Sequence, residues 1–274
     1  MVQRIMVAVV CVPLIFLVIY GLPPIFLPIM FSLLSMIGVH EVLWSTGFVK
    51  HARISGYSIV LAGLVPFWVY FGSDEKLILL GVLCYITLIF LEAMGSHYSV
   101  TLEKMGGSFL FTLIIPFFLS SFIRIDAIPE LGDYYILLPL VAAFMSDTGA
   151  FFTGIAIGKH KLAPELSPKK TVEGSVGGFV VAIACCCVYG LVMQYVFHLR
   201  VNFLFLAVYG ALGSVISQVG DLSFSYIKRQ YGLKDFGNIF PGHGGVLDRF
   251  DSVIFCAPLI ELLIWLLPAL ELGA

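Results

Sequence analysis

The sequence predicts an all-α integral membrane protein with about nine transmembrane helices. Of its 274 residues, 60% are hydrophobic and only 12% are charged, whereas soluble domains carry about 25% charged residues. The mean hydropathy is +1.03. A water-soluble core of this size needs far less apolar surface, so a lipid bilayer is the solvent that fits the composition.

Nine apolar runs have about the 20 residues that a helix needs to cross a bilayer. They cover residues 5–21, 22–44, 54–71, 76–95, 106–123, 133–157, 174–197, 202–228 and 250–271. The first two are separated only by a short segment with two prolines, which predicts a tight helical hairpin. The first run has an alternative reading as a signal peptide behind Arg4. We expect a retained helix, because no small-residue cleavage site follows it.

The basic residues predict the orientation in the membrane. With nine spans, twelve basic residues share the side of the N-terminus: Arg4, Lys50, Arg53, Lys104, Lys159, Lys161, Lys169, Lys170, Lys228, Arg229, Lys234 and Arg249. Only Lys76, Arg124 and Arg200 fall on the other side. Because cytoplasmic loops are enriched in Lys and Arg, we expect a cytoplasmic N-terminus in a cell (inner) membrane.

The chain divides loosely into three transmembrane blocks, 1–72, 73–157 and 158–274, and the charged residues concentrate in the last. The six cysteines all lie in apolar runs, which favours a packing role. We expect no nucleic-acid partner, because the sequence has neither an exposed basic domain nor a basic stripe interleaved with aromatic residues.

A polar stripe runs along the predicted span 202–228. Its members, spaced to lie on one helical face, are Ser214, Ser217, Gln218, Asp221, Ser225 and Lys228. A polar seam that joins helices explains serine and glutamine. A carboxylate inside a membrane is expensive, so Asp221 favours a cavity with a function.

The last predicted helix begins with a glycine-rich turn, residues 242–245, followed by Asp248, Arg249 and Asp251. Glycines let backbone amides approach a ligand, and a helix start attracts anions, so the turn suits phosphate. An Asp near a helix start also needs no functional explanation. The combination of two carboxylates with Arg249 and His243 favours the functional reading.

Two further segments hold polar residues. Asp147 shares a face with Ala150, Gly154 and Gly158, small residues that let another helix approach closely. It is a candidate metal ligand, or a buried carboxylate paired with a lysine. The loop 166–175 carries Lys169 and Lys170, which suit phosphates but also an ordinary cytoplasmic loop.

Other polar positions call for simpler interpretations. We expect Glu92, Ser96 and His97 to form an interfacial polar cluster, and Glu261 to pair helices. Glu41 lies near a membrane edge and requires no special account.

The residues from Ser225 to Asp251 resemble the signature of the phosphatidate cytidylyltransferases, also called CDP-diacylglycerol synthases. The matching positions are Ser225, Ile227, Lys228, Arg229, Lys234, Asp235, Gly237, Pro241, His243, Gly244, Gly245, Asp248, Arg249 and Asp251. The segments 146–149 and 167–174 also look like that family. The resemblance extends over essentially the whole chain, with no departure at the charged positions.

The resemblance implies a reaction of CTP with phosphatidic acid in phospholipid biosynthesis, giving CDP-diacylglycerol and pyrophosphate at the cytoplasmic face of a bilayer. Mg²⁺ suits carboxylates and phosphate oxygens, and a two-metal site is expected. We assign Asp221 and Asp248 as metal ligands, with Asp147, Asp235 and Asp251 as further candidates. The expected phosphate-binding and catalytic residues are Lys169, Lys170, Ser225, Lys228, Arg229, Lys234, His243, Gly244, Gly245 and Arg249. A homodimer is a further expectation.

Two alternatives stay open on the residues alone. One is a CTP-dependent lipid kinase, or a cytidylyltransferase for another lipid, which needs a similar metal and phosphate site. The other is an ion or anion transporter, because intramembrane aspartates also mark ion paths. The clustering of charges at one mouth argues against transport, and no inverted repeat is visible.

Overall fold

The computed structural model of this protein describes residues 13–72, 74–237 and 244–273. Its chain forms two compact units. The first consists of Met1–Ile123 with Gln230–Arg249, and the second of Arg124–Arg229 with Phe250–Ala274. Each unit therefore joins an early part of the chain to a later one.

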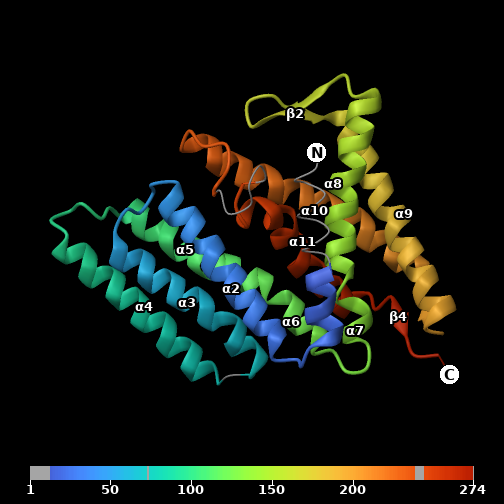
Figure 1. Cartoon of the computed structure of the whole chain (residues 1–274), viewed down its shortest axis with the longest axis horizontal. Coiled ribbons are helices and arrows are strands. Elements are labelled where there is room, and N and C mark those ends of the chain that lie inside the picture. Colours follow the sequence, from blue (N-terminus) through green and yellow to red (C-terminus); the bar gives the residue numbers. More distant parts are fainter. Residues whose placement is uncertain (1–12, 73, 238–243, 274) are drawn as a thin grey trace. The chain divides into compact units, whose positions relative to one another are not determined.

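The first unit is built from long helices that pack side by side (Figure 1). They are the π-helical turn η1 (Leu17–Gly21), α2 (Phe26–His40) with the π-helical turn η2 (Glu41–Ser45), α3 (Ala52–Tyr70), α4 (Glu75–Gly95), α5 (Leu102–Leu119) and the start of α6 (Ser121–Asp126). Helix α3 contacts α2, α4 and α5. Asp74 and Thr101 cap the starts of α4 and α5 by accepting hydrogen bonds from backbone amides.

The second unit also consists mainly of helices. They are α7 (Gly132–Tyr135), α8 (Leu138–Ile157), α9 (Val172–Val196), α10 (Phe203–Gln230) and most of α11 (Leu247–Leu266). Two small antiparallel sheets join them, one of β1 (Lys161–Ala163) with β2 (Ser167–Thr171), the other of β3 (Arg200–Val201) with β4 (Leu270–Glu271).

Helices α8 and α9 lie side by side (Figure 1), and glycines stand at their contact. A Cβ atom on Gly178 would lie 2.5 Å from the Ser146 carbonyl oxygen, and one on Gly174 would lie 2.8 Å from that of Ala150. Only glycine permits this approach. The prediction that small residues near Asp147 admit a second helix is therefore confirmed, and the second helix is α9.

The helix pairing expected of Glu261 is confirmed, whereas the polar cluster expected of Glu92, Ser96 and His97 takes a different form: Ser96 bonds the backbone of Ala93 and Val100, and Glu92 bonds residues of α3. Glu92 Oε1 accepts hydrogen bonds from Arg53 Nη1 at 3.3 Å and from Tyr57 Oη at 3.2 Å. In the second unit, Arg124 donates two hydrogen bonds to the Glu261 carboxylate, from Nε to Oε1 at 2.6 Å and from Nη2 to Oε2 at 2.8 Å. Glu261 thus joins helices, as its depth in an apolar run predicts.

The all-α membrane class is confirmed. Within the described residues, seven helical segments are long and apolar enough to span a bilayer, and they correspond to the second to eighth predicted runs. The run 5–21 lies largely outside the described residues. The run 250–271 is the helix α11, whose charged residues keep it out of the seven. In the described part of the chain, seven of the nine predicted runs are therefore helices able to span a bilayer, and an eighth is the more charged helix α11.

The structure corrects the internal continuity of two runs. The run 106–123 is broken into α5 and α6, and the run 133–157 into α7 and α8. The segment 166–175 is not wholly a loop, because residues 167–171 pair with β1 as a strand. Apolar composition fixes where the chain can cross a bilayer but not where a helix bends, so these breaks were not predicted.

Candidate active site

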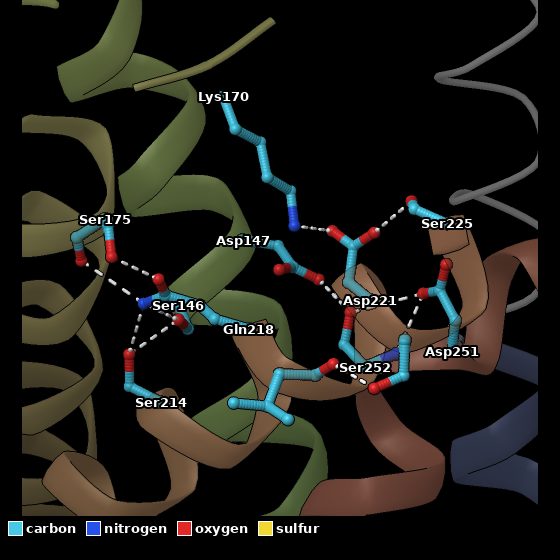
Figure 2. Close-up of polar contacts among 12 residues, drawn as sticks. Ser146, Asp147, Lys170, Ser175, Ser214, Gln218, Asp221, Ser225, Asp251 and Ser252 are labelled. Carbon is cyan, nitrogen blue, oxygen red and sulfur yellow. Dashed lines mark hydrogen bonds and ion pairs between the residues drawn. The ribbon is translucent and has the colours of Figure 1, made fainter. Parts of the chain in front are cut away.

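Three carboxylates of the second unit converge (Figure 2). Asp147 comes from α8, Asp221 from α10 and Asp251 from α11. Ser252 joins two of them: its hydroxyl donates to Asp147 Oδ2 at 2.7 Å and lies 3.3 Å from Asp251 Oδ1. The backbone amide of Ser252 also donates to Asp251 Oδ1 at 2.8 Å.

Cations accompany these carboxylates. Lys170 forms an ion pair with Asp221 Oδ2, and Ser225 donates to Asp221 Oδ1 at 3.4 Å (Figure 2). Lys228 is buried, and its charge attracts the Asp251 carboxylate. Asp221 and Asp147 repel that same carboxylate. Three carboxylates therefore share a partly buried place with two lysines, and their oxygens offer ligands to a further cation.

The neighbouring polar network fixes the helices that carry these groups. Gln218 Nε2 donates to Ser214 Oγ at 3.1 Å and to the Ser175 carbonyl at 3.2 Å, and Ser146 bonds Ser214 at 2.7 Å (Figure 2). These contacts join α8, α9 and α10. The polar stripe on α10 thus combines the two roles that its sequence left open, a seam between helices and a charged site. One half is a seam between helices, and the half with Asp221 faces charged groups.

The β1–β2 hairpin brings Lys170 to Asp221. Arg229 Nε donates to the Leu166 carbonyl at 3.1 Å, which ties the hairpin to α10. Thr171 caps α9 by accepting from the Gly174 amide at 3.1 Å. Lys169, the neighbour of Lys170 on β2, is exposed. Of the two basic residues of this strand, only Lys170 has an ion pair within the described group.

Asp248 has a separate environment in the first unit. Its Oδ2 atom accepts hydrogen bonds from the buried amides of Phe236 at 2.8 Å and Gly245 at 2.9 Å. The turn at Gly244 has a φ of +83°, a conformation that favours glycine. The Gly245 amide, predicted to hold phosphate, is thus bonded to Asp248. The carboxylate thus ties the backbone of Phe236 to that of Gly245, just before α11.

Sequence reasoning missed Glu41. This residue is only 2% exposed, and its carboxylate accepts hydrogen bonds from the amides of Val246 at 3.0 Å and Leu247 at 2.8 Å. The available signal was a carboxylate at the end of an apolar run. A position near a membrane edge is a sufficient explanation on sequence alone, and nothing in the local pattern indicates a partner so distant along the chain.

The remaining predicted residues have varied positions. Lys234, Asp235 and Arg249 are exposed in the first unit, and His243 lies outside the described residues. Asp221 belongs to the second unit and Asp248 to the first. Their pairing as metal ligands stays a prediction, whereas Asp147 and Asp251 share the unit of Asp221.

Carboxylate and hydroxyl oxygens are the ligands that Mg²⁺ prefers. In the part of the chain that the structure describes, no three Asp, Glu, His or Cys side chains are arranged as a ready metal site. Asp221 holds Lys170, and Ser252 bridges the other two carboxylates. The carboxylate and hydroxyl oxygens fit a divalent cation, and Mg²⁺ at this group is a proposal.

The fold and these groups define a class of protein: a multi-pass membrane protein with carboxylates and cations suited to phosphate-bearing substrates. The comparison with protein families is more specific. The model of the cytidylyltransferase family matches residues 2–267. The chain belongs to this family.

Curated relatives agree with that assignment. The chain is similar to the phosphatidate cytidylyltransferase of Bacillus subtilis, with 41% identity over 164 residues, 60% of each chain. It is 42% identical to that of Staphylococcus haemolyticus and 44% identical to that of Staphylococcus saprophyticus, in each case over 133 residues. These matches cover 48% of this chain and 50% of each staphylococcal protein. The chain thus matches between half and 60% of the length of these relatives.

Proposed function

We propose that the protein transfers the cytidylyl group of CTP to phosphatidic acid, giving CDP-diacylglycerol and pyrophosphate. The observation that carries the proposal is the group of Asp147, Asp221 and Asp251 with Lys170 and Lys228. Family membership and the names of the relatives support it. A membrane fold suits a reaction in which one substrate is a lipid and the other is water-soluble.

In this reaction an oxygen of the lipid phosphate forms a bond to the α-phosphorus of CTP. The bond from that phosphorus to the bridging oxygen of the β-phosphate breaks, and pyrophosphate leaves with the electron pair. The attacking phosphate is already an anion, so no strong general base is needed. The main tasks of the protein are to hold two anions in line and to offset their repulsion.

The basic residues suit these tasks. Lys170 and Lys228 lie with the carboxylates, and Lys169 and Arg229 are near them in sequence on β2 and α10. Asp221 would hold Mg²⁺, with Asp147 and Asp251 as further candidates in the same unit, and Asp248 of the first unit stays the second predicted ligand. The ion would supply positive charge to the transferring phosphate. Lys234, Asp248 and Arg249 of the first unit also belong to the predicted set.

The proposed site faces the cytoplasm, where CTP is available, and the proposed location is the cell membrane. The excess of basic residues on one side supports this orientation. The homodimer stays a prediction.

Purified protein with phosphatidic acid, Mg²⁺ and CTP tests the proposal. Label at the α-phosphorus of CTP should enter lipid, and label at the γ-phosphorus should appear only in pyrophosphate. A chelator should stop the transfer, and excess Mg²⁺ should restore it. Entry of γ-label into lipid would instead identify a kinase. No labelled lipid, with ion flux in vesicles, would favour a transporter.

A further inference from the structure

Glu41 is a buried carboxylate in an unusual setting. It lies in the first unit, in the π-helical turn η2 that ends the first described membrane span. A charge within a span is costly and marks a function or a specific partner. π-Helical turns are often found at functional sites. None of the ion pairs among the described residues includes Glu41.

Its partners are backbone amides at the start of α11. Oε1 accepts from Val246 at 3.0 Å and Oε2 from Leu247 at 2.8 Å, so both carboxylate oxygens are bonded. The first amides of a helix have no partner within the helix and carry a partial positive charge. The apolar side chain of Val246 cannot cap α11. Glu41 supplies that cap from 205 positions away in the sequence.

Two glycines of the signature make room for this carboxylate. A Cβ atom on Gly245 would overlap the Glu41 carboxylate, and a Cβ atom on Gly237 would lie 2.5 Å from Oε1. Both glycines therefore have a steric reason that does not involve a substrate. The Glu41 carboxylate therefore packs directly against the backbone at Gly237 and Gly245.

The capped turn carries residues assigned to the reaction. Asp248 and Arg249 directly follow the two amides that Glu41 holds, and Asp248 in turn binds the amides of Phe236 and Gly245. Two carboxylates thus bind three consecutive amides before and at the start of α11, Asp248 that of Gly245 and Glu41 those of Val246 and Leu247.

We propose that Glu41 is a positioning residue, which holds the turn at residues 244–247 and the start of α11 so that Asp248 and Arg249 present fixed positions to the substrates. The proposal rests on the proposed cytidylyl transfer. Glu41 itself need not touch CTP or lipid. Its effect should therefore appear mainly in kcat, because a small displacement of reacting groups costs about 100-fold in rate.

Glu41→Gln in the full-length protein is the first test. Glutamine keeps one oxygen acceptor but loses the charge and places an NH₂ group against a backbone amide. We expect kcat to fall by about 10- to 100-fold, with KM for CTP changed by less than about threefold. Glu92→Gln is the matched control, because Glu92 is a carboxylate of the same unit whose partners are Arg53 and Tyr57. It should behave as wild type.

Hydrogen exchange provides a readout that does not depend on turnover. Peptides covering residues 244–250 should exchange faster in Glu41→Gln than in wild type or Glu92→Gln, because the amides of Val246 and Leu247 lose a charged acceptor. Unchanged exchange would overturn the contact. Unchanged kcat with faster exchange would overturn the positioning role. A fall in kcat that only matches the loss of folded protein would reduce Glu41 to a structural role and also overturn it.

A double variant tests the steric link. Gly245→Ala should lower the thermal midpoint in the parent, where its methyl group meets the carboxylate. Gly245→Ala should lower the thermal midpoint much less in a protein that already carries Glu41→Ala, because the carboxylate is then absent. The effects of the two substitutions should therefore not add. Additive effects would contradict the arrangement. Wild-type protein that forms no CDP-lipid would refute the proposed function. Hydrogen exchange and the thermal midpoints would still decide whether Glu41 holds the turn at residues 244–247.

Discussion

The two aspartates assigned to metal should differ sharply in what they contribute to stability. Asp248 is 7% exposed, and one of its oxygens accepts hydrogen bonds from two buried backbone amides. Asp248→Ala leaves both amides without that acceptor. Each buried donor left unsatisfied costs about 1–3 kcal/mol. We therefore expect the variant to lose about 4 kcal/mol, a factor of about 1,000 in the ratio of folded to unfolded protein.

Asp221 is in a different position. Its side chain is 22% exposed, and its ion-pair partner Lys170 is 26% exposed. Partly solvated ion pairs contribute about 0–1 kcal/mol. Asp221→Ala should therefore lose at most about 1 kcal/mol, and removal of a repulsion with Asp251 offsets part of that loss. Both variants should lose cytidylyl transfer, but only Asp248→Ala should lose much stability.

Unfolding by denaturant titration in one detergent, followed for wild type and both variants, measures this difference. Asp235→Ala is the control, because Asp235 is an exposed carboxylate next to Phe236, whose amide Asp248 binds. It should change stability little. If Asp248→Ala proved as stable as Asp221→Ala, the two hydrogen bonds to Phe236 and Gly245 would not anchor the backbone there, and the reasoning would fail.

Two further predictions concern the fold. Glu261→Leu should destabilise the protein by about 2–3 kcal/mol, because it removes both charge-assisted hydrogen bonds between Glu261 and the part-buried Arg124. The double change Arg124→Met with Glu261→Leu should recover most of that loss in thermal unfolding, and equal stability of the single and double variants would contradict the prediction. Reporter fusions after residues 50, 100 and 234 should all report the cytoplasmic side, because these loops lie on the side of the membrane that is rich in Lys and Arg. A fusion that reports the outer side at one of these positions would require a different number of spans.

The candidate site was partly predictable because its charged residues contrast with an apolar chain. Asp221, Lys228 and Asp251 stood out as charges in membrane helices, and the structure brings Asp221 and Asp251 together with Asp147 and Lys170. The partners of Asp248 were not predictable. A pattern of residue types shows that a carboxylate lies near a helix start. It does not show whether the carboxylate oxygens bind a metal or accept hydrogen bonds from the neighbouring backbone.

The sequence by itself determined the membrane class, the positions of most spans and the signature, because hydropathy, run length and motif spacing are local properties of the chain. Only the tertiary structure decided that Glu41 caps α11, that Ser252 bridges Asp147 and Asp251, and that a β-hairpin delivers Lys170. These contacts join segments far apart in sequence. They depend on how helices pack and turn, and no local periodicity encodes that.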